Sequence, residues 1–248
     1  MEIRKINAAR GWIWVKQGWQ LIMLNPLMSV GFALMCALLT AVAFKIPVLG
    51  PLLAVLLLPM LLAVYMRVCR ALEEKEKIKL QHIFDGMQKY LPRLLALGAF
   101  ALMALLVISM VMVFIGGEAL TTLLEKFQST QDAQLLMGAM MAAGSGVPLS
   151  FIVGFTLLFA LMLALQYAPM LVLFSNEPPL SALRASLTGS MRNLIPYTVY
   201  SLIMQVAALA LSILPQGIGL IILLPLSLTS LYVSYRNIFP FAGELTSA

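Results

Sequence analysis

The chain has 248 residues, of which 62% are hydrophobic and only 10% are charged, and its formal net charge is +6. Soluble domains carry roughly 25% charged residues, so this composition excludes that class and predicts a membrane protein. The basic residues are spread along the chain, and the sidedness of a membrane protein explains their distribution. We therefore expect no nucleic-acid partner.

The first part of the chain, approximately residues 1–70, predicts an interfacial helix followed by two membrane crossings. Apolar residues recur at helical spacing before the first crossing, at Trp12, Val15, Trp19 and Ile22. Such a stripe indicates either a helix that lies on the lipid or a surface that packs against the bundle, and we expect shallow burial against the bundle rim. Asn25-Pro26 then ends the helix, because a residue that precedes proline avoids the α region. The two apolar windows that follow are 27–44 and 48–68, long enough for helices that cross a bilayer.

The second part, approximately 71–175, repeats this order around a longer connection. A second amphipathic stripe precedes Pro92 and consists of Leu80, Ile83, Phe84, Met87, Tyr90 and Leu91, with Gln88 on the opposite face. The crossings are windows 94–115 and 149–173. Between them, residues 116–147 form an insertion that we expect on the periplasmic side. It begins with a short amphipathic helix bearing Leu120, Leu123, Leu124 and Phe127.

The third part, 176–248, begins where Asn176-Glu177-Pro178-Pro179 breaks the chain. A third stripe follows, formed by Leu180, Leu183, Leu187, Met191, Leu194 and Ile195. The last two crossings are windows 198–214 and 218–235, which follow Pro196. Arg67 is the one ionisable residue within the six windows.

The order of interfacial helix, proline and two crossings therefore occurs three times, and the return crossings end near Tyr65, Tyr167 and Tyr232. We expect these tyrosines from the preference of aromatic side chains for the membrane interface. The chain is predicted to be an all-α polytopic membrane protein with six transmembrane helices in three pseudo-repeated units. Together the units form a single integral membrane domain.

Charge predicts the orientation of these helices. Fourteen of the sixteen basic residues fall before the first window, in the second-to-third and fourth-to-fifth connections, or in the tail, and only Lys45 and Lys126 fall on the other side. Lysine and arginine collect on the cytoplasmic side, so both termini are expected in the cytoplasm.

The candidate binding residues are polar or basic. Gln166 and Gln205 are the polar side chains most costly to bury within the crossings, and they indicate either a hydrogen bond between helices or the lining of a ligand site. Anionic lipid headgroups are the partners expected on the cytoplasmic side, at Arg67, Arg70, Lys89, Arg93, Arg184 and Arg192. A membrane-protein partner is a second expectation.

No pattern in the sequence indicates a catalytic, metal-binding or cofactor-binding site. The single histidine, His82, lacks neighbours at metal-ligand spacing, and neither a phosphate-binding loop nor a nucleophile–base pair is recognisable. We therefore expect no cofactor, no metal and no enzymatic activity. The leading hypothesis is a protein that binds lipid or a membrane partner. The alternative, suggested by the repeated hairpins, is a transporter or flippase of a lipid-like substrate.

Two segments carry a resemblance. Ala9-Arg10-Gly11-Trp12-Ile13-Trp14, with Gly18-Trp19 and Asn25-Pro26, resembles an uncharacterised family of proteobacterial inner-membrane proteins, as does Ser181-Ala182-Leu183-Arg184 with Ser190 and Asn193. The chain is more loosely similar to membrane domains attached to some glycerophosphodiester phosphodiesterases. The resemblance implies a six-helix inner-membrane protein. It transfers no catalytic residue, because the soluble phosphodiesterase domain is not found in this sequence.

Overall fold

The computed structural model describes residues 3–75, 87–129, 132, 134, 138, 144–213 and 217–240. Its elements, in chain order, are α1 (Arg10–Leu24), α2 (Pro26–Phe44), α3 (Leu49–Glu73), the 3₁₀ turn η1 (Gln88–Tyr90), α5 (Leu91–Ser129), α7 (Gly146–Gln166), α8 (Ala168–Ser175), α9 (Pro179–Arg192), α10 (Leu194–Leu211) and α11 (Ile218–Ile238). Helices dominate these residues, which contain no strand. The all-α prediction is therefore confirmed.

Six helical segments in the described residues are long and apolar enough to cross a membrane, one for each predicted window. Large apolar side chains cover their outer surfaces; Leu38, for example, is 65% exposed, and Leu209 is 72% exposed. Such exposure is unfavourable in water, whereas lipid tails accept these side chains. The chain is thus a polytopic membrane protein.

Local chemistry explains where several crossings begin. Pro26 is the first residue of α2, and the side chain of Asn25 accepts a hydrogen bond from the backbone nitrogen of Met28 at 3.2 Å. Proline fits the first turn because the backbone N–H that it lacks would have no partner there. Pro92 and Pro196 likewise lie in the first turns of α5 and α10, so the predicted boundaries are confirmed.

The chain divides into two compact units. Unit 1 comprises residues 1–99 and 163–248, and unit 2 comprises residues 100–162. This division differs from the three sequence repeats, which stay a prediction.

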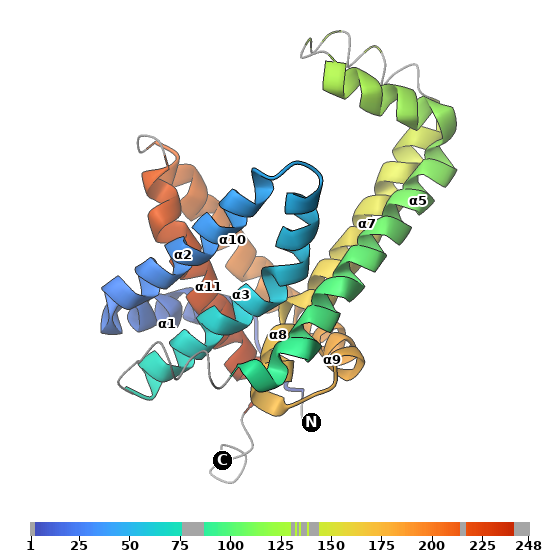
Figure 1. The fold of residues 1–248 in the computed structure, drawn as a ribbon. Coiled ribbons are helices and arrows are strands. Elements are labelled where there is room, and N and C mark those ends of the chain that lie inside the picture. The colour runs from blue at the N-terminus through green and yellow to red at the C-terminus, as the bar shows by residue number, and fades with distance from the viewer. Residues whose placement is uncertain are drawn as a thin grey trace. The chain divides into compact units, whose positions relative to one another are not determined.

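Within unit 1, α1 packs most extensively along α11 and also contacts α10, while α2 and α3 form an antiparallel hairpin. The N-terminal segment lies beside the end of α11, and the α2–α3 turn lies at the opposite end of the unit (Figure 1). The candidate site described below lies at the end of unit 1 that carries the N-terminal segment.

The packing faces of α1 and α9 differ from the predicted stripes. On α1, the buried residues are Gly11, Trp14, Gly18, Leu21 and Ile22, whereas Trp12 and Trp19 are exposed. The prediction that the tryptophan stripe packs against the bundle is therefore wrong. Lipid accepts large apolar side chains as well as a protein core does, so the packing face combines two glycines with Trp14, Leu21 and Ile22 while the other large side chains face outward.

The same correction applies to α9. Its buried face consists of Ala182, Leu183, Ser186, Gly189 and Ser190, so small residues recur at a spacing of four. Of the predicted stripe, Leu183 is buried, whereas Leu180, Met191 and Ile195 are more than half exposed. Close approach of backbones at the small residues contributes more to this face than burial of leucine does.

The return crossing before α9 is interrupted at Tyr167, between α7 and α8. Ser186 of α9 fills the interruption: its hydroxyl accepts a hydrogen bond from the Tyr167 backbone nitrogen at 3.0 Å and donates one to the Leu163 carbonyl at 2.8 Å. In a continuous helix those two backbone groups would bond directly to each other. One buried serine therefore satisfies both groups at the break.

The three tyrosines predicted near the interface lie in the core of unit 1. Tyr65, Tyr167 and Tyr232 are each at most 1% exposed. The Tyr167 ring packs near Tyr235 and Phe239, and its hydroxyl shares a 2.9 Å hydrogen bond with Ser234. Packing between helices therefore accounts for these rings, and their depth in the membrane stays a prediction.

Unit 2 contains most of α5 and α7. Gly117, with φ of 57° and ψ of −154°, interrupts the helical backbone of α5. Beyond it, Leu120 and Leu123 are buried in a small cluster with Val147. The short amphipathic helix is confirmed, although Leu124 and Phe127 of the predicted face are exposed. Most of 130–143 lies outside the described residues.

The second amphipathic stripe is described only in part. Leu80, Ile83 and Phe84 lie outside the described residues, as does His82. At its end, Met87 is 6% exposed and Gln88 is exposed, which is the predicted sidedness.

Candidate functional site

The N-terminal segment is held in place by one buried amide side chain. Asn193, which is 1% exposed, accepts a hydrogen bond from the backbone nitrogen of Ile6 at 2.8 Å and donates one to the Arg4 carbonyl at 2.9 Å. The Arg4 nitrogen donates to the Ile238 carbonyl at 3.0 Å. These bonds tie the start of the chain to α9 and to the end of α11, and so position Arg4 and Lys5.

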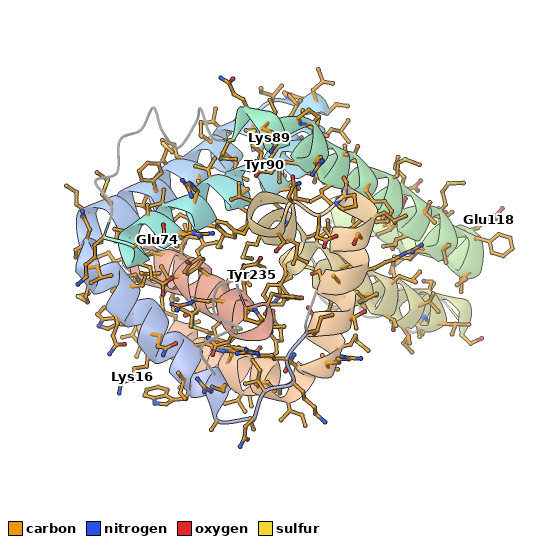
Figure 2. All side chains as sticks on the ribbon, turned by 90° about the horizontal axis from the view of Figure 1, so that it is seen from below. Lys16, Glu74, Lys89, Tyr90, Glu118 and Tyr235 are labelled. Carbon is orange, nitrogen blue, oxygen red and sulfur yellow. The ribbon has the colours of Figure 1, made fainter. Side chains whose placement is uncertain are left out.

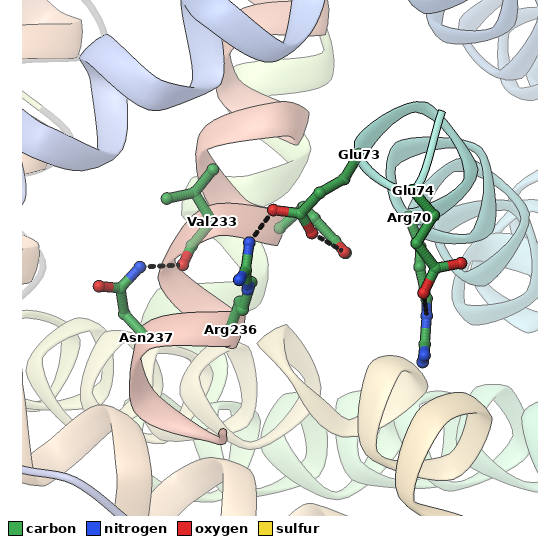
Figure 3. Close-up of polar contacts among 7 residues, drawn as sticks. Arg70, Glu73, Glu74, Val233, Arg236 and Asn237 are labelled. Carbon is green, nitrogen blue, oxygen red and sulfur yellow. Dashed lines mark hydrogen bonds and ion pairs between the residues drawn. The ribbon is translucent and has the colours of Figure 1, made fainter. Parts of the chain in front are cut away.

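A carboxylate lies near the same end of α11. Glu73, the last residue of α3, accepts a hydrogen bond from the Tyr232 hydroxyl at 2.8 Å and forms an ion pair with Arg236 (Figure 3). A negative charge at a helix C-terminus is unfavourable, and the neighbouring arginine offsets it. Both carboxylate oxygens therefore have partners within the protein.

Between these groups lies a pocket of about 620 Å³. Its basic side chains come from the N-terminal segment, from the first turn of α1 and from α11, and they are Arg4, Lys5, Arg10 and Arg236. Glu73 is the one acidic residue among the described residues of the lining, and apolar atoms come from Leu21, Leu24 and Val233, among others. Positive charge thus exceeds negative charge beside an apolar wall.

This arrangement has the chemistry of an anion site. Guanidinium and ammonium groups donate several hydrogen bonds to phosphate or carboxylate oxygens, and the charge strengthens them. Arg10 is exposed and contacts the Asn237 side-chain oxygen at 3.4 Å, so its remaining donors face the pocket region and solvent. The leucines beside the cations suit a ligand that is anionic at one end and apolar at the other.

The six basic residues predicted as lipid contacts do not line this pocket. Arg70 pairs with Glu74 at 2.8 Å and lies over the Phe174 ring, and Arg93 donates to the backbone and side-chain oxygens of Asn176. These two arginines therefore already stabilise contacts between helices of unit 1.

The other four remain distributed over the surface of unit 1. Arg184 and Arg192 are exposed on α9, and Arg67 is partly buried on α3. Lys89 lies 5.6 Å from the centre of the Tyr90 ring. Figure 2 shows Lys89 beside α5 and Lys16 pointing outward from α1, with Tyr235 inside the ring of helices. Whether these side chains contact lipid stays a prediction.

The two glutamines predicted as ligand lining line neither this pocket nor a second cavity between α2, α3 and α11 that is described below. Gln205 is exposed on α10 and donates to Ser201 of its own helix at 3.1 Å. Gln166 ends α7, and its amide nitrogen is buried with no hydrogen-bond partner among the described residues. No described contact brings the two amides together.

Sequence reasoning did not single out the four cations of the pocket. It placed Arg4, Lys5, Arg10 and Arg236 on one side of the membrane, but they lie at opposite ends of the chain. The available signal was their position next to the first and last helices. Only the pairing of α1 with α11 shows that they share a site.

Comparison with known proteins agrees with a membrane protein. No family model and no solved structure matches the chain. The chain is similar to a probable inner membrane protein of Burkholderia thailandensis, with 28% identity over 262 residues, 96% of this chain and 94% of the relative. This likeness is consistent with the uncharacterised inner-membrane family. It supplies no link to glycerophosphodiester phosphodiesterases.

Proposed function

We propose that this protein binds the anionic headgroup of a membrane phospholipid in the basic pocket at the end of unit 1. The observation that carries the proposal is the convergence of Arg4, Lys5, Arg10 and Arg236 around one carboxylate that is already paired. A phosphate group accepts hydrogen bonds from Lys5 and Arg10, and Arg4 and Arg236 add positive charge beside it. The apolar wall suits the glycerol and upper acyl region.

Binding rather than catalysis is the proposed activity. The carboxylate of the pocket is engaged by Tyr232 and Arg236, which leaves it poorly placed to act as a general base. A membrane-protein partner at the same basic surface is the competing form of binding. Copurification of a protein in place of lipid would indicate this second form of binding.

The test compares two double variants of the full chain with equal loss of charge. Lys5→Gln with Arg10→Gln removes two cations of the pocket, whereas Lys16→Gln with Lys45→Gln removes two exposed cations that neither line it nor are predicted lipid contacts. Affinity for phosphatidylglycerol is measured by native mass spectrometry, with phosphatidylcholine and inorganic phosphate as comparison ligands.

The pocket variant should bind phosphatidylglycerol roughly tenfold or more weakly, because a charge-assisted hydrogen bond contributes about 1.5–3 kcal/mol. The control variant should stay near the wild type. Equal weakening in both variants would show that general surface charge, rather than the pocket, attracts the lipid. Equal affinity for phosphatidylcholine would also contradict the proposal.

A transporter of a lipid-like substrate is the alternative. The interruption at Tyr167 favours it, since transporters often use broken helices. The bonds of Ser186 already fill that interruption, which is why binding is preferred. Proteoliposomes with fluorescent phosphatidylglycerol discriminate the two: transbilayer movement faster than in protein-free liposomes would support transport.

We also propose that both termini face the cytoplasm of an inner membrane, as the charge distribution predicts. A membrane-impermeant maleimide should label Lys126→Cys in cells whose outer membrane alone is permeable. Lys16→Cys should be labelled only after the inner membrane is opened. Labelling in the reverse order would invert the topology.

A further inference from the structure

A second cavity, separate from the basic pocket, lies between α2, α3 and α11. It has a volume of about 420 Å³, and its lining is almost entirely apolar. Ala33, Ala37 and Ala41 contribute to it from α2 at a spacing of four, which places them along one face of that helix. All three helices are membrane-spanning segments, so the cavity is an apolar groove at membrane depth.

One polar group in this groove lacks a partner. Tyr65 lines the groove and is 1% exposed, and its hydroxyl has no hydrogen-bond partner among the described residues. The other polar groups of the lining are engaged: the Thr40 hydroxyl donates to the Cys36 carbonyl at 2.9 Å, and the Cys36 thiol contacts the Leu61 carbonyl at 3.8 Å. Leaving a hydroxyl without a partner in apolar surroundings is unfavourable, so a ligand acceptor there would be stabilising.

The depth of Tyr65 indicates what supplies the missing acceptor. Tyr65 precedes Glu73 by eight residues on α3, which is about 12 Å along the helix. Glu73 lies at the partly exposed basic pocket, so Tyr65 lies a short way inside the hydrocarbon layer. The ester carbonyls of a phospholipid occur between headgroup and acyl chains, at about this depth. A water molecule fits less well, because it needs about two to four polar partners.

We propose that this groove holds one acyl chain of a glycerophospholipid, with an ester carbonyl accepting a hydrogen bond from Tyr65. The chain lies against Ala33, Ala37 and Ala41, where small side chains leave room for it. The hydroxyl is covered in this structure, so side chains of the groove wall must move before the carbonyl reaches it. This site does not depend on the basic pocket or on its proposed function.

The experiment uses the full chain in proteoliposomes containing a phospholipid with a diazirine on its acyl chain. After illumination, mass spectrometry of peptides measures the label on α2 and α3. Ala37→Phe fills the groove, and Leu38→Phe places the same side chain on the neighbouring lipid-facing position, where Leu38 is 65% exposed. Tyr65→Phe removes only the hydroxyl.

Groove labelling should fall at least fivefold in Ala37→Phe and stay unchanged in Leu38→Phe. Tyr65→Phe should reduce it roughly two- to tenfold, the effect of one lost hydrogen bond. Unchanged labelling in Ala37→Phe would overturn the groove as a site. Unchanged labelling in Tyr65→Phe would overturn the carbonyl assignment.

A measurement on the wild type keeps the proposal falsifiable if Ala37→Phe does not fold. Cys36 lines the groove, so added phospholipid should slow its reaction with N-ethylmaleimide in detergent at least threefold. An unchanged rate would overturn the proposal. The Lys5→Gln, Arg10→Gln variant should keep wild-type groove labelling even where headgroup binding is lost, so failure of one site is distinguishable from failure of the other.

Discussion

Replacing Gly18 by alanine should separate α1 from α11 and sharply lower the thermal stability of the protein. A Cβ atom at Gly18 would lie 2.9 Å from the backbone nitrogen of Ser230 and 3.0 Å from its Cα. Backbone atoms cannot move aside as a flexible side chain can, so the helices must shift. Overpacking of this kind typically costs about 1–3 kcal/mol.

The measurement is the unfolding temperature of the purified protein in detergent, followed by size-exclusion chromatography after heating. Gly31→Ala is the matched control, because no atom lies within 4 Å of a Cβ at that position on α2. Alanine has the higher helix propensity, so this control should be neutral or stabilising by up to about 1 kcal/mol. Similar losses in both variants would show that α1 does not dock closely on α11.

The second large effect is expected from Ser186→Ala. The substitution removes the hydroxyl that joins the Tyr167 backbone nitrogen to the Leu163 carbonyl, and Ser186 is 0% exposed. The Tyr167 nitrogen then loses its partner, whereas the Leu163 carbonyl still accepts a hydrogen bond from the Ser190 hydroxyl at 3.3 Å. One buried backbone group left without a partner costs about 1–3 kcal/mol. We therefore expect a lower unfolding temperature and faster proteolysis near the α7–α8 break.

Thr188→Val provides the control on the same helix. The Thr188 hydroxyl is exposed and bonds only to the Arg184 carbonyl of its own helix, so its removal should change stability little. A Ser186→Ala protein as stable as Thr188→Val would mean that the backbone closes the break by itself. The serine would then be a packing residue rather than a bridge.

Gly18→Ala and Ser186→Ala should also affect the proposed site, because α1 and α9 position it. The pocket draws Arg10, Leu21 and Leu24 from α1, and Asn193 at the end of α9 holds the N-terminal segment. Displacing either helix should weaken headgroup binding in parallel with stability. The Lys5 and Arg10 variants differ, because they should reduce binding while the unfolding temperature stays close to that of the wild type.

The sequence by itself determined the class of protein and the approximate position of every crossing. Long apolar runs must be helical in lipid, where unpaired backbone groups have no partner. Proline boundaries at Pro26, Pro92 and Pro196 are local as well, since proline lacks the backbone N–H. The break before α9 was similarly readable from Asn176-Glu177-Pro178-Pro179, and Asn176 indeed has a left-handed φ of 55°.

Only the tertiary structure decided which faces pack and which charges meet. Hydrophobic periodicity predicts a core face in water, but lipid solvates leucine and tryptophan, so the stripe containing Trp12 and Trp19 faces outward while Gly11 and Gly18 pack. Arg4 and Arg236 share a pocket because α1 lies along α11 and Asn193 holds the N-terminal segment. Such long-range pairings depend on helix contacts between distant parts of the chain, and no local pattern of residues encodes them.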